Sequence, residues 1–212
     1  MRMRVLALLV GFMGVAHAET GVVAGKVSLK GGSEAWVYVE DLVTPLPSDE
    51  AQRPVAKMFQ KDKGFAPRVL VVTRGTKVEV PNADPIFHNV FSVTAGSTFD
   101  LGSYPRGQSR SVTMVRAGQV NVFCNIHPQM IGYILITPGP NVVKAAADGS
   151  YRLEGLPPGK HRVTAWAPDT RRVTQEVEVA ADKPAEANFT LEPGAVRTHL
   201  RKDGTPYGSY GE

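Results

Sequence analysis

Short runs of apolar and β-branched residues, separated by Gly and Pro, occupy most of the chain. Runs of this length, with alternating or continuous apolar positions, are typical of strands, whereas apolar residues at helical spacing are not sustained beyond the N-terminus. Only residues 50–61 have a spacing compatible with a short helix. The pattern therefore predicts an all-β fold, with strands in the middle of the chain at residues 69–72, 76–80, 112–115, 120–123 and 131–136.

The composition changes at Pro138-Gly139-Pro140, which indicates a domain boundary. Residues 141–192 contain hairpin-sized runs between turn residues, and residues 173–179 alternate strictly, so we expect a second, smaller β-sandwich there. Residues 193–212 are polar and rich in Gly, and we expect them to be a flexible tail.

Two further strands are predicted near the start of the chain, at residues 22–29 and 35–40. They either open the first sandwich, giving a first domain of residues 19–137, or pair with the smaller sandwich of residues 141–192. The hydrophobic pattern defines the strands but not their partners, so both placements remain open.

The N-terminus has the pattern of a secretory signal peptide. Two arginines precede an apolar run at residues 5–15, and Ala16-His17-Ala18 follows it as a small-residue cleavage site. The run is shorter than the ~20 residues that a membrane-spanning helix needs. We therefore expect residues 1–18 to be cleaved, with export to the periplasm and no membrane span.

The formal net charge is +4 at pH 7, and the charged residues are dispersed. There is no block of Lys and Arg and no basic helix with interleaved aromatic residues. A nucleic-acid partner is therefore not expected.

Cys124 is the only cysteine of the 212 residues, which excludes an intramolecular disulfide, a zinc ribbon and an iron–sulfur cluster. His127 and Met130 follow it at intervals of three, in a loop between two predicted strands, and His88 ends another predicted strand segment. Two imidazoles, one thiolate and one thioether are the ligand set of a blue copper centre. His88, Cys124, His127 and Met130 are therefore the candidate metal ligands.

The neighbours of these residues are candidates for supporting roles. Asn89 follows the first ligand and is expected to tie the two ligand segments together, while Pro128 stiffens the loop. The flanking residues that we expect to support the ligands are Asn89, Phe123, Asn125 and Pro128.

Each of these residue types also has a simpler interpretation. A lone cysteine is often a small buried hydrophobe, and a lone histidine is often an ordinary core or surface residue. His161 and His199 have no partner at ligand spacing and are assigned no metal role. Trp36 and Trp166 lie in predicted strands and are expected to anchor the core.

The motifs His88-Asn89-Val90 and Cys124-x-x-His127-Pro128-x-Met130 resemble the plastocyanin and amicyanin branch of the cupredoxins. Residues 20–137 are similar to bacterial periplasmic cupredoxin-domain proteins, some of them labelled methylamine utilisation protein-like. Residues 141–192 resemble a carboxypeptidase regulatory-like or transthyretin-like β-sandwich.

The resemblance implies a cupredoxin-like Greek-key β-sandwich that holds one copper ion, cycling between Cu(I) and Cu(II), at His88, Cys124, His127 and Met130. It also implies that His127 is the electron port. The redox partner implied by the family is a dehydrogenase or a c-type cytochrome.

An enzyme with a second copper is not expected, because only His161 and His199 remain as spare histidines in the mature chain. No Ser-His-Asp set, paired-carboxylate motif or phosphate-binding Gly loop is present either. The favoured hypothesis is a periplasmic electron carrier. Two alternatives stay open: a copper-delivery module, and a structural or recruitment protein whose metal site is incidental.

Overall fold

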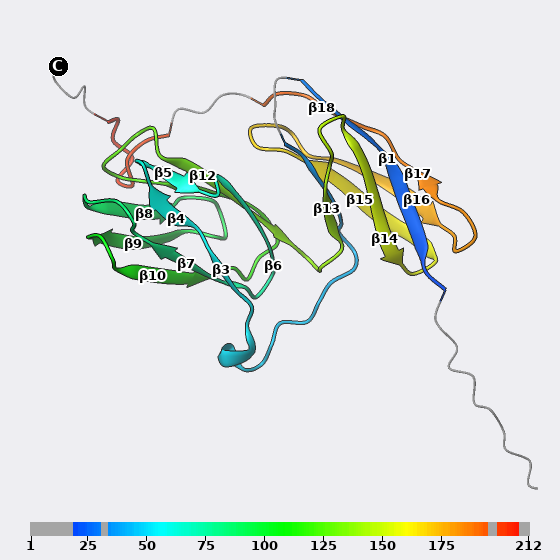
Figure 1. Ribbon diagram of the computed structural model, residues 1–212, viewed down its shortest axis with the longest axis horizontal. Helices are drawn as coiled ribbons and strands as arrows, with labels where there is room; N and C mark the ends of the chain where they lie inside the picture. The colour runs from blue at the N-terminus through cyan, green and yellow to red at the C-terminus, as the bar shows by residue number, and fades with distance from the viewer. Residues whose placement is uncertain (1–18, 31–33, 195–198, 208–212) are drawn as a thin grey trace, which may run out of the picture.

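The computed structural model describes residues 19–30, 34–194 and 199–207, so the signal peptide expected at residues 1–18 lies outside the described residues. The described part holds 18 strands and a single short 3-10 turn, which confirms the predicted all-β fold class (Figure 1). No helix in these described residues is long and apolar enough to cross a membrane. The strands are β1 (Gly21–Leu29), β2 (Trp36–Val39), β3 (Val55–Lys57), β4 (Phe59–Lys61), β5 (Gly64–Ala66), β6 (Val69–Thr73), β7 (Lys77–Pro81), β8 (His88–Ser92), β9 (Phe99–Tyr104), β10 (Ser109–Thr113), β11 (Gly118–Phe123), β12 (Ile131–Thr137), β13 (Val142–Lys144), β14 (Ser150–Leu156), β15 (Gly159–Trp166), β16 (Val173–Val179), β17 (Ala185–Glu186) and β18 (Phe189–Leu191).

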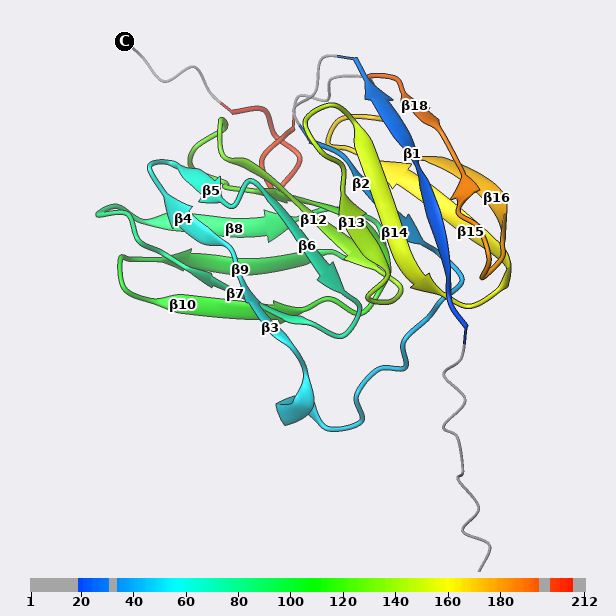
Figure 2. The ribbon, with the colours of Figure 1, turned by 45° about the vertical axis from the view of Figure 1, so that its right-hand side comes forward.

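The strands form two sandwiches that lie side by side (Figures 1 and 2). The inserted sandwich, β3 to β12, combines a five-stranded sheet in the order β6-β12-β11-β8-β9 with a three-stranded sheet in the order β10-β7-β3. The host sandwich combines a sheet of β14, β1, β17 and β18 with a second sheet in the order β13-β2-β15-β16. Each sandwich has its own apolar core.

Strands β1 and β2 belong to the host sandwich. Val23 of β1 pairs with Leu153, and Val39 of β2 pairs with Val163, so both strands have their partners beyond the boundary at residues 138–140. The sequence left two placements open for these strands, and the structure pairs both of them with strands of the host sandwich. The reason is burial, because Val23 and Val27 point into a core built from β14, β15, β16 and β18.

The sandwiches meet through the outer faces of β2 and β12. Every residue of β2 is buried, because Val37 and Val39 enter the host core while Trp36 and Tyr38 enter the junction. Alternate strand residues point to opposite faces, so a strand covered on both sides buries them all. The junction cluster consists of Trp36, Tyr38, Val69, Tyr133, Leu135 and Trp166.

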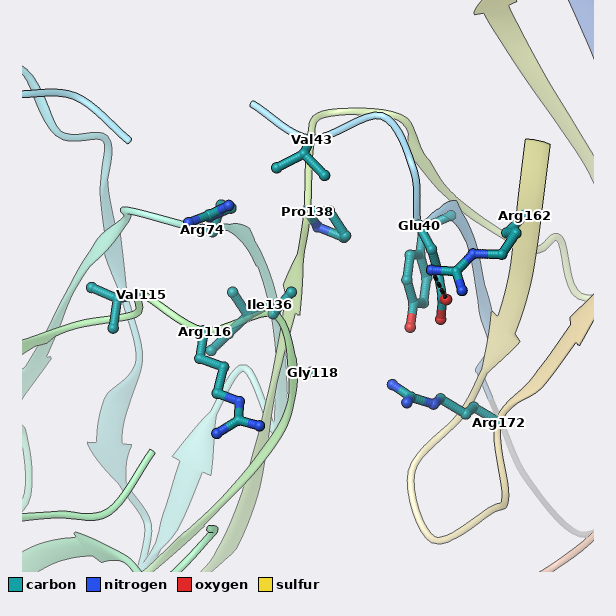
Figure 3. A pocket seen from close by; sticks show the side chains of 12 residues that line it. Glu40, Val43, Arg74, Val115, Arg116, Gly118, Ile136, Pro138, Arg162 and Arg172 are labelled. Atoms are coloured by element: carbon teal, nitrogen blue, oxygen red, sulfur yellow. Dashed lines mark ion pairs between the residues drawn. The ribbon is translucent and has the colours of Figure 1, made fainter. Parts of the chain in front are cut away.

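Polar contacts reinforce the junction. The Trp166 indole N–H donates to Gln119 Oε1 at 2.7 Å, and the Tyr133 hydroxyl donates to the carboxylate of Asp169, with 2.7 Å to Oδ1. A cavity of about 420 Å³ lies nearby, and arginines from both sandwiches line it (Figure 3). Those arginines are Arg74 and Arg116 of the inserted sandwich and Arg162 and Arg172 of the host sandwich.

The segment that sequence spacing made compatible with a short helix is mostly extended. Only Glu50–Gln52 forms one 3-10 turn, η1, which Asp49 caps by accepting from the Ala51 N–H at 2.9 Å. Pro54 follows the turn and cannot donate the N–H that a longer helix would need. The chain then enters β3 and β4.

Candidate metal centre

Three strand ends bring the candidate ligands together at one end of the inserted sandwich. His88 is the first residue of β8, Cys124 follows the last residue of β11, and Met130 precedes the first residue of β12. Phe91 of β8 pairs directly with Phe123 of β11, so the two ligand-bearing strands are neighbours in the sheet.

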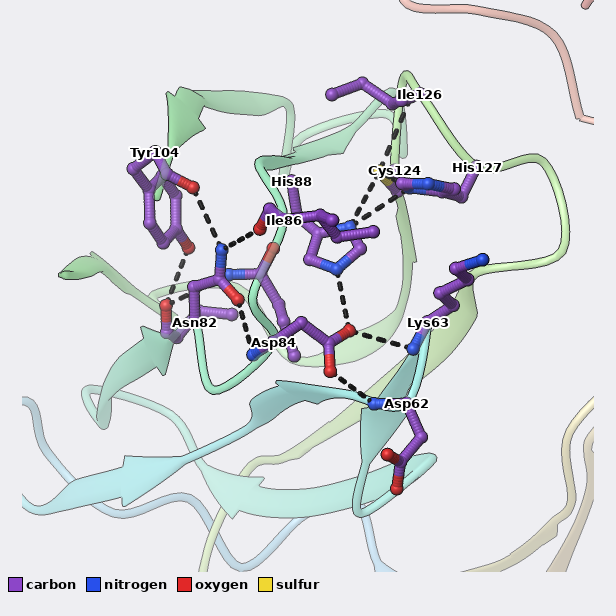
Figure 4. Close-up of polar contacts among 12 residues, drawn as sticks. Asp62, Lys63, Asn82, Asp84, Ile86, His88, Tyr104, Cys124, Ile126 and His127 are labelled. Carbon is purple, nitrogen blue, oxygen red and sulfur yellow. Dashed lines mark hydrogen bonds and ion pairs between the residues drawn. The ribbon is translucent and has the colours of Figure 1, made fainter. Parts of the chain in front are cut away.

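The three nitrogen and sulfur donors converge on one point. His88 Nδ1 lies 3.1 Å from His127 Nδ1, and Cys124 Sγ lies 3.9 and 3.8 Å from these two nitrogens (Figure 4). Zinc, as a guide to transition metals, binds imidazole at ~2.0 Å and thiolate at ~2.3 Å. Each separation is shorter than the sum of two such bonds, so one ion can bind all three side chains.

Asp84 fixes the ring of His88. Its Oδ2 lies 2.8 Å from His88 Nε2, and a carboxylate only accepts, so Nε2 carries the proton (Figure 4). The lone pair of the ring is then on Nδ1, which faces Cys124 and His127. A carboxylate on the remote nitrogen of a histidine ligand is the arrangement that orients such ligands in metal sites.

The tight turn between β4 and β5 holds Asp84 in place. Asp62 and Lys63 link β4 and β5 with φ of 55° and 53°, in the left-handed region that a two-residue hairpin turn requires. Their backbone N–H groups donate to the Asp84 carboxylate at 2.7 and 2.8 Å. These hydrogen bonds offset the cost of placing two non-glycine residues in that region.

The charge of Asp84 follows from the same contacts. Burial raises the pKa of Asp84, but the hydrogen bonds from Lys63, His88 and Asp62 lower it by more, and the net pKa lies below its usual value. Asp84 is therefore ionised at neutral pH and is matched to the protonated Nε2 of His88.

Asn82 and Tyr104 brace the segment before His88. The Asn82 side chain donates to Ile86 O at 2.8 Å and Tyr104 O at 3.0 Å, and its Oδ1 accepts from the Asp84 N–H. The Tyr104 hydroxyl donates to Val80 O at 2.6 Å. Both side chains are buried, so the loop from β7 to β8 is fixed from inside the sandwich.

His127 is only partly buried, unlike His88. Burial lowers the pKa of His127, and the neighbouring His88 and Lys63 lower it further, against the opposing effect of Asp84. The ring is therefore neutral at neutral pH, which is the form that binds metal ions. Phe87, the residue before His88, is 57% exposed.

Cys124 is fully buried, and its sulfur accepts the Ile126 N–H at 3.4 Å. The loop closes on itself, because the Met130 N–H donates to His127 O at 3.0 Å and the Cys124 N–H to Met130 O at 3.4 Å. Met130 is also fully buried, in the same core cluster as Cys124. The hydrogen bonds of this loop therefore bring the thiol, the imidazole and the thioether residue into one turn.

Among the flanking residues, Asn89 makes a different contact from the one expected of it. The Asn89 side chain donates to Asp100 Oδ1 at 2.8 Å, on the neighbouring strand β9, rather than to the ligand loop. Phe123 lies 5.7 Å from Phe91 between ring centroids. Asn125 and Pro128 offer their oxygens to the C-terminal segment.

Residues 199–207, which we expected to be part of a flexible tail, lie against the ligand loop. The His199 ring stacks on Phe123 with centroids 4.2 Å apart, and its Nε2 is 2.6 Å from Pro128 O. The Tyr207 hydroxyl donates to Cys124 O at 2.6 Å. The tail expectation is corrected for this segment, because its polar residues find backbone acceptors that the loop leaves open.

Sequence reasoning missed Asp84, Tyr207 and the contact of His199. A carboxylate four residues before a candidate histidine ligand was the available signal for Asp84. No spacing rule connects residues 199–207 to a loop that lies far earlier in the chain.

The donor set fits a soft or borderline transition metal. A thiolate suits Cu(I), imidazoles suit copper in either oxidation state, and the three donors already lie close together. Magnesium and calcium prefer oxygen ligands, and no carboxylate stands among the three donors. The residues present are therefore compatible with copper.

Comparison with known proteins gave a family match for part of the chain. Residues 135–192 match the model of the carboxypeptidase regulatory-like domain. A search of curated proteins finds no match to the chain.

Several solved structures are similar to part of the chain. A purple cupredoxin from Nitrosopumilus maritimus is 19% identical, with 39% of this chain and 99% of that chain covered, at a TM-score of 0.35. A reduced mutant of amicyanin is 20% identical, with 47% of this chain and 97% of that chain covered, at a TM-score of 0.37. A copper-containing nitrite reductase from Thermus scotoductus SA-01 is 22% identical, with 46% of this chain and 28% of that chain covered, at a TM-score of 0.38. Likeness at this level carries no inference about function.

Proposed function

We propose that this protein is a type 1 copper protein that carries single electrons between redox partners in the periplasm. The observation that carries the proposal is the convergence of His88 Nδ1, His127 Nδ1 and Cys124 Sγ on one point. Met130 is the proposed axial ligand. A bound copper ion would supply the one-electron couple between Cu(I) and Cu(II).

The residues of the chain contribute a rigid and dry cage. His88, Cys124 and Met130 are fully buried, and Asp84 holds His88 in the tautomer that offers Nδ1. Ligands that are fixed in advance move little when the charge of the site changes, which favours fast electron transfer. The hydrogen bond from the Ile126 N–H to the Cys124 sulfur is of the kind that tunes the reduction potential of such a site.

The partly exposed His127 is the proposed electron port. A partner that docks over its ring would come within reach of a metal ligand, and Phe87, the residue before His88, offers an exposed apolar side chain. We propose a dehydrogenase or a c-type cytochrome as that partner. The chain is proposed to have no substrate chemistry of its own.

The test is the visible spectrum of copper-loaded protein. The oxidised protein should show an intense thiolate-to-copper band, and Cys124→Ala should abolish it. Met130→Leu should shift the band and the reduction potential, whereas Met114→Leu is the matched control, because Met114 is another buried methionine of the same core. A colourless Cu(II)-saturated protein would refute the proposal.

The same preparation separates electron transfer from copper delivery. An electron carrier retains its ion through repeated oxidation and reduction in the presence of a Cu(I) chelator. Rapid loss of copper to the chelator would instead favour a delivery module. The complete burial of Cys124 opposes that alternative, since a delivery site must let an acceptor reach its soft ligand.

A further inference from the structure

We propose that residues 199–207 form a clasp that fixes the ligand loop, residues 124–130, to the neighbouring strands and sets the ligand positions before metal binds. The claim that the clasp fixes the loop depends only on contacts within the chain. The claim that the clasp affects bound copper rests on the proposed function. His199, Lys202 and Tyr207 are the positioning residues, and none of them is proposed as a ligand.

The clasp holds three consecutive parts of the ligand loop. Tyr207 donates to Cys124 O at 2.6 Å, the Lys202 N–H donates to Asn125 Oδ1 at 2.9 Å, and His199 Nε2 donates to Pro128 O at 2.6 Å. A carbonyl oxygen only accepts, so the proton of the His199 contact is on Nε2. The loop is therefore held on both sides of His127.

The clasp also reaches the strands that carry His88. Lys202 Nζ lies 2.7 Å from Asp100 Oδ2 on β9, and Asp100 Oδ1 accepts from the Asn89 side chain at 2.8 Å. Asn89 is the residue after His88. One short segment thus connects both ligand-bearing parts of the sandwich, which the Asn89 side chain alone does not do.

Aromatic contacts reinforce the polar ones. The His199 ring lies nearly parallel to Phe123, with 17° between the planes, and Tyr207 meets His199 edge-on at 5.0 Å between centroids. The Arg201 guanidinium lies over the Tyr207 ring at 5.6 Å. Phe123 directly precedes Cys124 and is only 7% exposed, so this stack shields the strand end that delivers the thiol.

The clasp has its own local structure. The Arg201 N–H donates to Thr205 O at 2.8 Å, the Gly204 N–H to Arg201 O at 2.9 Å, and Asp203 Oδ1 accepts from the Thr205 N–H. This compact turn places His199 and Tyr207 on the side of the loop. The Leu200 side chain is 49% exposed.

These contacts have a consequence for the ligands. The carbonyls of Cys124 and Pro128 lie on either side of His127, a ring that must stay in place when charge at the site changes. A loop fixed at those carbonyls resists opening, and local opening is what amide hydrogen exchange measures. The clasp should therefore slow exchange in the loop with or without copper.

The experiment compares two truncated chains without metal. One ends after residue 198 and lacks the clasp, and the other ends after Tyr207 and keeps it. Removing the clasp should accelerate exchange of the Ile126 and Met130 amides by roughly tenfold, the change expected when one or two hydrogen bonds that resist opening are lost. The chain that ends after Tyr207 should exchange like the full protein. Equal rates in all three chains would overturn the clasp.

Point variants guard against a general loss of folding. Tyr207→Phe removes only the hydroxyl bonded to Cys124 O, and it should accelerate exchange at the loop while leaving exchange in β14 and β15 unchanged. Leu200→Ala is the matched control within the segment and should leave the loop unaffected. Equal acceleration by both variants, or acceleration in the host sandwich as well, would contradict a positioning role.

Copper loading separates this inference from the proposed function. Where the thiolate-to-copper band appears, loss of the clasp should shift the reduction potential and speed the transfer of Cu(I) to a chelator. If the band, the reduction potential and the transfer rate all stay unchanged, the effect on copper is overturned. Where exchange accelerates without the clasp but no chain develops the band, the clasp is supported and the proposed function fails.

Discussion

Asp84 Oδ2 lies 2.8 Å from His88 Nε2, and both groups are buried. This contact decides which nitrogen of His88 faces the thiol, and it depends in turn on two backbone N–H groups of the β4–β5 turn. The geometry of the candidate metal centre is thus set by residues outside the ligand set.

Replacing Asp84 by Asn should weaken copper binding by roughly 10- to 100-fold, the range seen when partners of metal-bound histidines are removed. The amide keeps the shape of the side chain but removes the charge that favours a proton on His88 Nε2. Competition against a chelator of known affinity gives the measurement. Asp148→Asn in the host sandwich is the control and should bind copper like the unmodified protein. An unchanged affinity of Asp84→Asn would show that Asp84 does not orient the ligand.

Gly132→Ala should destabilise the inserted sandwich. A Cβ at Gly132 would lie 3.1 Å from three atoms of the Phe65 side chain, which is buried in the same core as Met130. Overpacking of this kind costs about 1–3 kcal/mol. Urea unfolding measures the loss, and Gly64→Ala is the control, because its Cβ would meet only Lys61 O at 3.5 Å. Equal stability of the two variants would contradict the tight contact.

Trp166→Phe should weaken the junction between the sandwiches. The change removes the indole N–H and leaves the partly buried Gln119 Oε1 without its donor, at a cost of about 0.5–1.5 kcal/mol, the net contribution of a typical hydrogen bond. Trp36→Phe removes a similar ring from the same cluster without breaking this bond and should cost less. Thermal unfolding of both variants compares them, and a larger loss for Trp36→Phe would contradict the role of the hydrogen bond.

Asp41 should contribute stability that disappears in acid. Burial raises the pKa of Asp41, but hydrogen bonds from the Arg162 N–H and from His161 lower it by more, and the net pKa lies below its usual value. A depressed folded pKa stabilises the fold above the unfolded pKa of ~3.9, and the contribution is lost as the pH falls through the folded value.

Asp41→Asn should therefore be less stable than the unmodified protein at pH 5, and the difference should shrink below about pH 4. Chemical unfolding at several pH values between 5 and 2.5 provides the measurement. A difference that stays constant through this range would show that the Asp41 carboxylate does not act through its charge.

The strands and the position of the ligand loop could be predicted from the sequence. The runs at residues 69–72 and 131–136 became β6 and β12 with bounds that differ by one residue, because both strands have buried positions along their length. The placement of Cys124 after one strand and of Met130 before the next followed from the same pattern, and the three polar donors of the predicted set do lie together.

What the sequence left open depends on pairing over long distances. The alternation in residues 22–29 shows that one face of a strand is buried but not which strand covers it, and β1 pairs with β14 across the whole inserted sandwich. Tyr207 was missed for the same reason, because its partner in the ligand loop is set by the folded path of the chain. Asp84 lies only four residues before His88, but this spacing does not show that the turn at Asp62 and Lys63 holds its carboxylate against the ring.

The interruption of the host sandwich also governs the order in which a newly made chain can fold. Gly21 stands opposite Leu156, so β1 lacks this neighbour until the chain is available as far as Leu156. The contiguous strands from Val55 to Thr137 have all their sheet partners before then. As the chain becomes available from its N-terminal side, the inner unit can be completed first, and the enclosing unit closes around its two ends afterwards.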